Sequence, residues 1–444
     1  MAEAPVPTGT SRIVKYLGTE SRANAPDPVD AELRRRVIDT LAAIAGGHQF
    51  AAAERMSAFV RSSFGGGDAT VLDGTGETAT PVGATLANAL AGNILDVDDD
   101  NAVAGGHPAV VVLPAIMAAV ESEGGTVGDL LDAFLPAYEI AVRTAIALHA
   151  RTGMYNGSGS WGAVGAAAGV ARAREFAPDV AADAVGIAEF NAPIAPVMRS
   201  LALPSSSMTK DGIGWGGFVG ATAADLAERG FTGSGTVFDE IEYEGLDRTS
   251  LDSLGERYYL LDGDYKPYPA CRWTHPGIDA IAAQVADHDV DPRSVEVVRV
   301  GTHENATVMT ERRPSTPSEA EYSFPYVAAR ALLNGGNFTP ADLTWRARED
   351  ETTLALADRV ELAVDEEAEA RYPEEYLVRI ELETPSRTYE SGLFGLRPLT
   401  ADEREQKWEG LLDDALGPGT TATLRERIED DDLPIEELLA PWAP

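Results

Sequence analysis

The segment VGDLLDAFLPAYEIAVRTAIALHA, residues 127–150, indicates the fold of this chain more clearly than any other stretch. Its apolar residues recur at helical spacing. Thr126 stands before it and Asp129 follows three residues later, which is the spacing of a capping box, where each side chain binds the other residue's backbone N–H. The pattern predicts a long helix that begins after Thr126.

Helical spacing continues on both sides of this segment. The run that begins at Ala31 stops at Gly46 and Gly47, a favourable end for a helix. Residues 1–28 are rich in Pro, Ala and Ser and predict a flexible leader, whereas residues 29–267 predict an all-helical domain. Further helices are expected at 81–96, 162–176, 180–192 and 215–230, many of them rich in alanine.

The character of the chain changes after Pro267. Three stretches, 294–303, 359–364 and 377–383, alternate apolar and polar residues and contain many β-branched side chains, as half-buried strands do. A helix is expected at 320–336. The fold class is therefore mainly α with an α+β part: a large all-helical domain, a smaller α+β lid domain over 268–395, and C-terminal helices over 396–444 that return to the helical domain.

Composition limits the class of protein. With 444 residues and 44% hydrophobic side chains, the chain can bury a large core. We find no apolar stretch of 18 residues for a membrane span and no signal-peptide pattern, so we expect a cytoplasmic protein. Because Cys271 is the single cysteine, an intrachain disulfide is impossible.

Acidic residues outnumber basic ones by 72 to 35, which gives a formal net charge of −37. Nucleic acids and anionic membrane surfaces are bound through clustered Lys and Arg, so we expect neither as a partner. The charge is spread along the chain, which is typical of the solvated acidic surface of salt-adapted proteins.

The basic residues are almost all arginine: 31 arginines stand against four lysines. Two of these lysines, Lys210 in SMTKDGIGWGG and Lys266 in DYKPYPACRWTH, lie in unusual local sequence. Lysine carries a compact charge whose pKa falls on burial, which suits proton transfer. We therefore take Lys210 and Lys266 as candidate site residues, against the alternative that either is an ordinary surface lysine.

The acidic stretch LDVDDDNAVAGGHPAVVVLP begins at residue 95 and resembles a calcium loop only in part. Asp96, Asp98 and Asp100 occupy its positions one, three and five. Position six is Asn101 where the turn requires glycine, and position twelve is His107 where the loop requires a bidentate glutamate. A magnesium–diphosphate site would need a second acidic motif on a facing helix. We therefore expect no metal ion at this stretch.

Other catalytic motifs are weak or missing from the sequence. GSGSWG at 157–162 matches G-x-G-x-x-G, but helical sequence precedes it where the dinucleotide fingerprint requires a strand. We find no G-x-S-x-G elbow of a serine hydrolase. The sequence therefore predicts no cofactor.

Two histidines, His107 and His275, are each followed by proline, which favours a turn at an element boundary. The other four histidines lack such surroundings and are expected to be structural.

The candidate residues as a set suit proton transfer next to a carboxylate. An arginine and the scarce lysines can bind carboxylates and stabilise the charge that forms when a proton leaves the neighbouring carbon. The unusual positions are Asp96, His107, Lys210, Lys266, Cys271, Arg272, His275 and Tyr322.

Six motifs in order resemble those of the MmgE/PrpD family, which includes 2-methylcitrate dehydratase, cis-aconitate decarboxylase and iminodisuccinate epimerase. They are NALAGNILDVDDD, GGHPAVVVLPAIMAAVES, GSGSWGAVGAAA, MTKDGIGWGGFVGATAADLAERGFTG, YKPYPACRWTHPGIDA and EAEYSFPYVAARALLNGG. The resemblance implies a homodimer with a cofactor-free active site between a helical domain and a lid. It also implies catalytic roles for the matching residues Asp96, His107, Lys210, Lys266 and Tyr322.

The chain departs from the family pattern at three positions. Asn93 and Asn156 stand where family members often carry histidine, and Cys271 stands where members acting on cis-aconitate carry histidine. An asparagine orients polar groups but exchanges no proton, which argues against the decarboxylase mechanism. Cys271 is a catalytic acid or base if Arg272 and Lys266 stabilise its thiolate, and otherwise a buried thiol that fills space.

These observations lead to a hypothesis of a cofactor-independent lyase acting on a small di- or tricarboxylic hydroxy acid. Lys210 and Arg272 would hold carboxylates, and Asp96 or Cys271 would move the proton at the α-carbon. Crowding of Asp96 by its neighbours is expected to raise a carboxyl pKa toward neutrality. Epimerisation, decarboxylation and simple binding of an acid remain alternatives. The candidate substrate-binding residues are Asp100, Asn156, Arg272 and His275.

Overall fold

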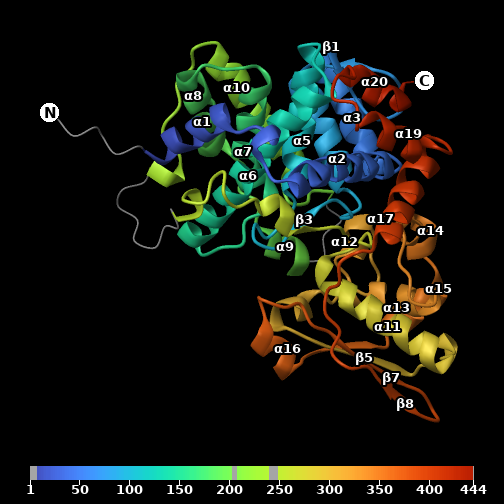
Figure 1. Ribbon diagram of the computed structural model, residues 1–444. Helices are drawn as coiled ribbons and strands as arrows, with labels where there is room; N and C mark the ends of the chain where they lie inside the picture. Colours follow the sequence, from blue (N-terminus) through green and yellow to red (C-terminus); the bar gives the residue numbers. More distant parts are fainter. Residues whose placement is uncertain (1–7, 203–207, 240–248, 444) are drawn as a thin grey trace.

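The computed structural model describes residues 8–202, 208–239 and 249–443. Most helices gather in one large body, and a smaller part with a sheet lies at one end of it (Figure 1). The protein is therefore mainly helical with an α+β part, as the sequence predicts. Within the described residues, no helix combines the length and the apolar character that crossing a membrane requires.

Helix α6 (Val127–Thr152) forms the centre of the large body, and its predicted capping box between Thr126 and Asp129 is present. It packs against α7 (Ser158–Ala173) through small residues. A Cβ atom at Gly165 would lie 2.6 Å from the Cβ of Ala141, so only glycine permits this approach. The neighbouring helices are α2 (Asp27–Gly47), α3 (Ala51–Phe64), α4 (Pro81–Asn93), α5 (Pro108–Ser122), α8 (Pro178–Asn191), α9 (Val197–Ala202) and α10 (Ile213–Glu228).

Part of the predicted flexible leader, residues 1–28, is helical. Residues Gly9–Thr19 form helix α1, and Ile13, Tyr16 and Leu17 are buried. These three side chains share one helix face and pack against Val164 and other apolar residues of the body, so burial holds the segment in place.

The region 29–267 is not all-helical. A Gly-rich strand β1 (Gly65–Thr70) pairs with β2 (Thr78–Ala79), with an irregular register between Gly65 and Ala69. Strand β3 (Asp100–Asn101) pairs with β4 (Gly263–Asp264). This second pairing matters for the site, because it brings the acidic loop beside the segment that carries Lys266.

The three predicted strands and a fourth, β8, which was not predicted, form one sheet in the order β6-β5-β7-β8. Strand β5 is parallel to β6 and antiparallel to β7, and β7 is antiparallel to β8. The strands are β5 (Val297–Thr302), β6 (Val360–Val364), β7 (Arg379–Glu383) and β8 (Thr388–Glu390), and the helices of this part are α11 (His275–His288), α12 (Pro317–Glu321), α13 (Phe324–Leu333), α14 (Trp345–Arg348), α15 (Glu351–Ala357) and α16 (Glu366–Arg371).

The predicted helix 320–336 is broken into α12 and α13. Ser323 has extended backbone dihedrals and caps α13 by accepting a hydrogen bond from the Tyr326 N–H at 2.9 Å. The break leaves Glu321 and Tyr322 at the end of α12, where both side chains are buried.

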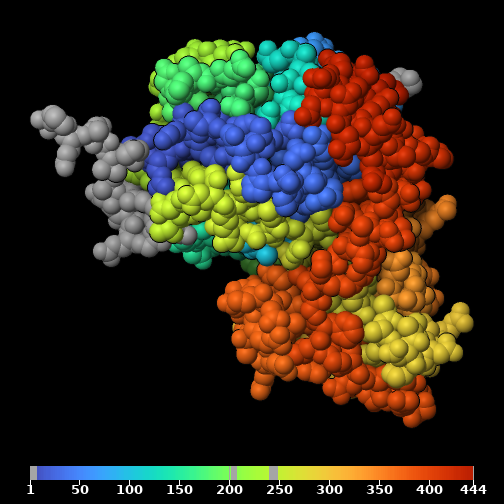
Figure 2. All heavy atoms as spheres, viewed as in Figure 1, coloured from blue at the N-terminus to red at the C-terminus, as the bar shows by residue number. Residues whose placement is uncertain are grey.

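The chain after Thr400 runs along the side of the large body (Figures 1 and 2). The Val127 and Gly128 N–H groups donate to the carbonyl oxygens of Leu433 and Asp431 at 2.9 Å each. The domain limits themselves stay a prediction from the sequence. The elements here are α17 (Ala401–Trp408), a π-helical turn (Glu409–Asp413), α18 (Asp414–Leu416), α19 (Thr420–Arg427) and α20 (Ile435–Leu439).

Candidate active site

The acidic loop begins where α4 ends, three residues earlier than the sequence predicts. The Asp96 N–H donates to the Asn93 carbonyl oxygen at 3.1 Å, and Asp96 adopts a left-handed backbone conformation with φ 50°. Aspartate is one of the few side chains that tolerates this conformation. The turn directs the Asp96 carboxylate inward, where it is 2% exposed.

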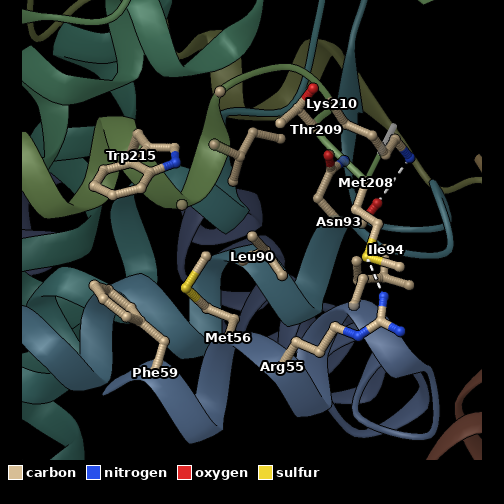
Figure 3. A pocket seen from close by; sticks show the side chains of 14 residues that line it. Arg55, Met56, Phe59, Leu90, Asn93, Ile94, Met208, Thr209, Lys210 and Trp215 are labelled. Atoms are coloured by element: carbon tan, nitrogen blue, oxygen red, sulfur yellow. Dashed lines mark hydrogen bonds between the residues drawn. The ribbon is translucent and has the colours of Figure 1, made fainter. Parts of the chain in front are cut away.

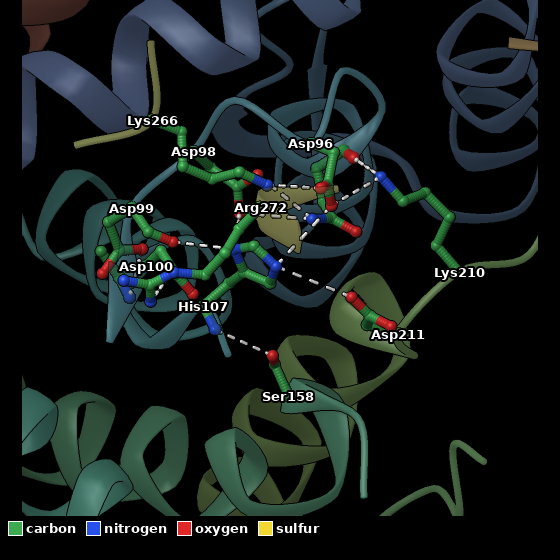
Figure 4. A network of polar contacts seen from close by, with 12 residues as sticks. Asp96, Asp98, Asp99, Asp100, His107, Ser158, Lys210, Asp211, Lys266 and Arg272 are labelled. Carbon is green, nitrogen blue, oxygen red and sulfur yellow. Dashed lines mark hydrogen bonds and ion pairs between the residues drawn. The ribbon is translucent and has the colours of Figure 1, made fainter. Parts of the chain in front are cut away.

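Two of the four lysines converge on this carboxylate from opposite sides (Figure 4). Lys266, from the loop after β4, forms an ion pair with Asp96 Oδ2. Lys210, from the segment before α10, donates to Asp96 Oδ1 at 3.1 Å. Both lysines were predicted as site residues, and both lie in contact with the predicted aspartate.

The histidine of the HP motif, His107, precedes α5 and lies below this cluster in Figure 4. Its Nδ1 lies 2.7 Å from the Asp99 carbonyl oxygen and 3.3 Å from Asp98 Oδ2. Its Nε2 lies 3.7 Å from Asp96 Oδ1 and 3.8 Å from Asp211 Oδ2. The carbonyl contact favours a proton on Nδ1, so Nε2 is directed toward the two carboxylates.

Asp96, His107 and Lys266 border a small cavity between the large body and the α+β part. The body supplies Asp96, Asp100, His107 and Asp211, among other residues. The volume is about 50 Å³, room for one or two water molecules. The opposite wall carries Lys266, Cys271, Arg272, Trp273, Tyr322 and Tyr376.

Arg272 is already paired with two carboxylates, one of them across the cavity. Its guanidinium forms ion pairs with Asp100 and, at 2.8 Å, with Asp264 Oδ2. Arg272 and Asp100 were predicted to bind substrate. In this arrangement Asp100 and Asp264 occupy two sides of the guanidinium, so a substrate carboxylate would bind Arg272 through its remaining N–H donors or in place of Asp100.

The carboxyl groups of the loop differ in their pKa. Burial alone would raise the pKa of Asp96, but Lys210, Lys266 and His107 outweigh it and hold that pKa well below its usual range. Burial raises the pKa of Asp98, and it raises the pKa of Asp99 to about 7. The expectation of at least one raised carboxyl pKa in this loop agrees with Asp98 and Asp99, whereas the two ammonium groups keep Asp96 ionised, so Asp96 is not that base.

Two further groups on the cavity, Asp211 and His107, have a raised pKa. Burial raises the pKa of Asp211. Burial alone would lower the pKa of His107, but the carboxylates of Asp98 and Asp96 outweigh it and raise that pKa. A carboxyl group and an imidazole, each with a raised pKa, therefore face each other at the cavity.

Cys271 lines the cavity as a thiol and not as a thiolate. Burial and the nearby Asp96 charge raise its pKa to about 12, although Lys266 lowers it. Arg272 cannot supply the stabilising charge because its guanidinium is paired with two carboxylates. Cys271 can donate a proton weakly, and the predicted thiolate base is not supported. Tyr322 also reaches the site, with its hydroxyl 3.4 Å from Asp96 Oδ1.

Two predicted substrate-binding residues lie away from the cavity. Asn156 donates to Thr152 Oγ1 at 2.9 Å and to the Met154 carbonyl oxygen at 3.0 Å, so its amide closes the turn after α6. His275 Nε2 lies 2.9 Å from the Ala270 carbonyl oxygen, and burial lowers the pKa of His275 to about 3. Both side chains stabilise local structure.

Lys210 does not line the cavity. Its side chain borders a separate, mainly apolar pocket of about 360 Å³, and its ammonium donates to the Asn93 carbonyl oxygen at 2.8 Å (Figure 3). The same ammonium also donates to Asp96 Oδ1 and, at 2.8 Å, to Glu321 Oε2. An ammonium has three N–H donors, so these acceptors leave none for the predicted substrate carboxylate.

Two groups, Asp211 and Glu321, and one contact, that of Asn93, were not predicted from the sequence. Asp211 follows Lys210 directly, and Glu321 precedes Tyr322, so their positions beside predicted site residues were the available signal. Asn93, which stands in place of a family histidine, donates to Asp98 Oδ1 at 3.2 Å. The sequence gives no means of finding that contact, because it depends on how α4 ends.

Asp96, His107 and Asp211 also offer three ligand atoms within 4.8 Å of one another, a spacing that could hold a metal ion. The same Asp96 oxygens accept from Lys210 and Lys266, so a cation would compete with two ammonium groups. The expectation that no metal takes part stays a prediction, tested below.

The site combines buried carboxylates, two ammonium groups and an imidazole. It lies where a helical body meets a small α+β part, and this combination defines a class of protein. Residues 11–252 match the model of the MmgE/PrpD N-terminal domain, and residues 268–433 match that of the MmgE/PrpD C-terminal domain. The chain belongs to the MmgE/PrpD family. Membership supports a dehydratase-like or lyase-like activity. A comparison with curated proteins finds no match.

Proposed function

We propose that the protein is a cofactor-independent lyase that dehydrates a small di- or tricarboxylic hydroxy acid such as 2-methylcitrate. One observation carries the proposal: the Lys266 ammonium and the His107 imidazole border one cavity with the carboxyl group of Asp211. Cations beside a bound carboxylate stabilise the charge that develops when a proton leaves the neighbouring carbon. Family membership agrees with this reaction class.

In this proposal Asp211 accepts the proton from the carbon next to the carboxylate. His107 donates a proton to the departing hydroxyl group, which leaves as water while a carbon–carbon double bond forms. His107 Nε2 and Asp211 Oδ2 are 3.8 Å apart, so both can reach one small substrate. The raised pKa makes the Asp211 carboxylate a stronger base, and it keeps His107 protonated to a higher pH so that it can donate.

Asp96 then acts as a fixed anion and not as the base. It holds the Lys266 ammonium at the cavity wall, where two of its three N–H donors are available for a substrate carboxylate. Among the described residues, Asp96 is the one hydrogen-bond acceptor of that ammonium.

Binding of such an acid requires movement of the α+β part. The cavity of about 50 Å³ is far smaller than the roughly 300 Å³ or more of typical ligand pockets. Opening would separate Arg272 from Asp100, and Arg272 would then bind a substrate carboxylate in place of Asp100.

NMR of the protein in deuterated high-salt buffer with a panel of hydroxy- and amino-diacids tests the proposal. Alkene signals with loss of water support dehydration. Exchange of the α-proton without an alkene would indicate epimerisation, loss of carbon dioxide would indicate decarboxylation, and no change across the panel would favour a binding protein. Turnover that disappears with a divalent-metal chelator and returns with metal would contradict a metal-free mechanism.

A further inference from the structure

A carboxyl group outside the cavity shares one of the active-site lysines. Glu321 ends helix α12 and is fully buried. Its Oε2 accepts from Lys210 Nζ at 2.8 Å, while its Oε1 has no hydrogen-bond partner among the described residues. Glu321 does not border the cavity, so it cannot touch a substrate there.

The backbone around Glu321 ties it to the α+β side of the site. Its carbonyl oxygen accepts from the Cys271 N–H at 3.0 Å, and the next residue, Tyr322, directs its hydroxyl toward Asp96. Asp96 belongs to the large body. Lys210 therefore bridges two carboxyl groups that come from opposite sides of the cavity.

We propose that Glu321 is a positioning residue that competes with Asp96 for the Lys210 ammonium and so controls how strongly Lys210 neutralises Asp96. The inference rests on the proposed function for its effect on turnover. The contact itself does not depend on which acid the enzyme uses.

The charges that face Glu321 determine when this competition changes. Burial raises the pKa of Glu321 to about 8, although Lys210 and Lys266 lower it, and Asp96 adds to the rise. The Tyr322 hydroxyl is the further titratable group beside it, and burial keeps it protonated by raising its pKa well above the usual value. Below pH 8 a neutral Glu321 leaves the Lys210 charge to Asp96, whereas above pH 8 the ionised carboxylate draws Lys210 toward itself.

The lysine ammonium groups give a readout that does not require turnover. With four lysines in the chain, ¹⁵N NMR of lysine-labelled protein yields few Nζ signals, and Lys210→Arg assigns the one from Lys210. We expect this signal to shift with a midpoint near pH 8 in the wild type. We expect no such shift in Glu321→Gln and a shifted midpoint in Glu321→Asp. An unchanged titration in Glu321→Gln would overturn the proposal.

The pH dependence of kcat/KM provides the second measurement. The wild type should change activity with a midpoint near pH 8, Glu321→Gln should lose that transition, and Glu321→Asp should restore one. The exposed residue Glu349, on the same part of the chain, gives a matched control in which Glu349→Gln leaves the profile unchanged. If no acid in the panel reacts, the proposed function fails, while the lysine signals still decide the role of Glu321.

Discussion

Helix α6 and the Asp96 loop both hold ionised groups out of water, but they compensate those charges differently. In α6, Glu139 and Arg143 are fully buried and form an ion pair one helical turn apart. Glu139 also accepts from the Leu260 N–H at 2.8 Å, and Arg143 donates to the Arg257 carbonyl oxygen at 2.9 Å. Each charge has one opposite charge and backbone partners, and the pair borders none of the cavities described here.

Around Asp96 the carboxyl groups outnumber the cationic groups, and one cationic group can pair with two carboxyl groups. This imbalance separates the pKa of Asp96, which is held low, from the pKa values of its neighbours, which burial raises. The balanced pair of α6 lies away from the cavity, whereas the unbalanced cluster places groups of raised pKa beside it, where they can exchange protons. The carboxyl groups are Asp96, Asp98, Asp99, Asp100, Asp211 and Glu321, and the cationic groups are Lys210, Lys266, Arg272 and His107.

Removal of the ammonium at the cavity should have the largest effect. Lys266→Met leaves Asp96 with one lysine and removes the donor that faces the substrate, so we expect turnover to fall by about 10³-fold. Steady-state kinetics on folded protein measure this loss of turnover. Lys15→Met, at an exposed lysine, is the control and should keep full activity. A loss below tenfold for Lys266→Met would remove Lys266 from the mechanism.

Breaking the ion pair between Glu139 and Arg143 should lower the free energy of unfolding and leave turnover unchanged. Glu139→Gln leaves the Arg143 charge buried without an anion, which costs about 3–5 kcal/mol. Denaturant unfolding at fixed salt concentration measures the loss. Turnover per folded molecule should stay unchanged. A variant with wild-type stability and reduced turnover would place the Glu139–Arg143 pair in the active site, and the difference between this pair and the Asp96 cluster would be lost.

The raised pKa of Asp99 should make stability depend on pH. Because its folded pKa of about 7 exceeds its ordinary value, Asp99 contributes stability that is full below about pH 4 and is lost as pH rises toward 7. Asp99→Asn removes this contribution, so the stability difference between wild type and variant should shrink over that range. Unfolding curves of both proteins from pH 4 to 8 in constant salt test this expectation. A stability difference between wild type and variant that does not change with pH would contradict the raised pKa of Asp99.

Replacement of the thiol should have a smaller effect. Because Cys271 is protonated and donates weakly, Cys271→Ser keeps a donor of similar size, and we expect turnover within about tenfold of the wild type. As the single cysteine, it should react slowly with a thiol reagent in the native state and quickly in denaturant. Fast alkylation of the native protein near neutral pH would indicate a thiolate.

The smallest effect is expected away from the cavity. Asn156→Ala removes two hydrogen bonds in the turn after α6, which should cost about 1 kcal/mol of stability per bond. Turnover should stay within about twofold. Kinetics and thermal unfolding of the same preparation separate the two quantities. A loss of activity much larger than this would return Asn156 to the substrate site.

Much of the fold could be predicted because its signals are local. The capping box of Thr126 and Asp129, and the period-two pattern of β5, β6 and β7, depend on residues a few positions apart. Helix α1 had such a signal in Ile13, Tyr16 and Leu17, but a Pro- and Ala-rich composition obscured it. The irregular β1–β2 pairing had none, because its strands are held by neighbours and not by their own pattern.

The site was predicted as a set of residues but not as an arrangement. Motifs and rare lysines selected Asp96, His107, Lys210 and Lys266, and the structure brings these four into contact. Asn156 and His275 do not line the small cavity, so their predicted roles in substrate binding stay predictions. Both have side chains suited to bind a substrate, but nearby backbone carbonyl groups use them instead.

By itself, the sequence determined which residue types are present and where helices and strands form, because those choices depend on neighbouring residues. Only the tertiary structure decided which carboxyl group stays ionised and which lysine faces the cavity. Lys210 and Lys266 lie 114 and 170 residues from Asp96 along the chain. Charge and pKa depend on distance and burial in space, and chain folding fixes both.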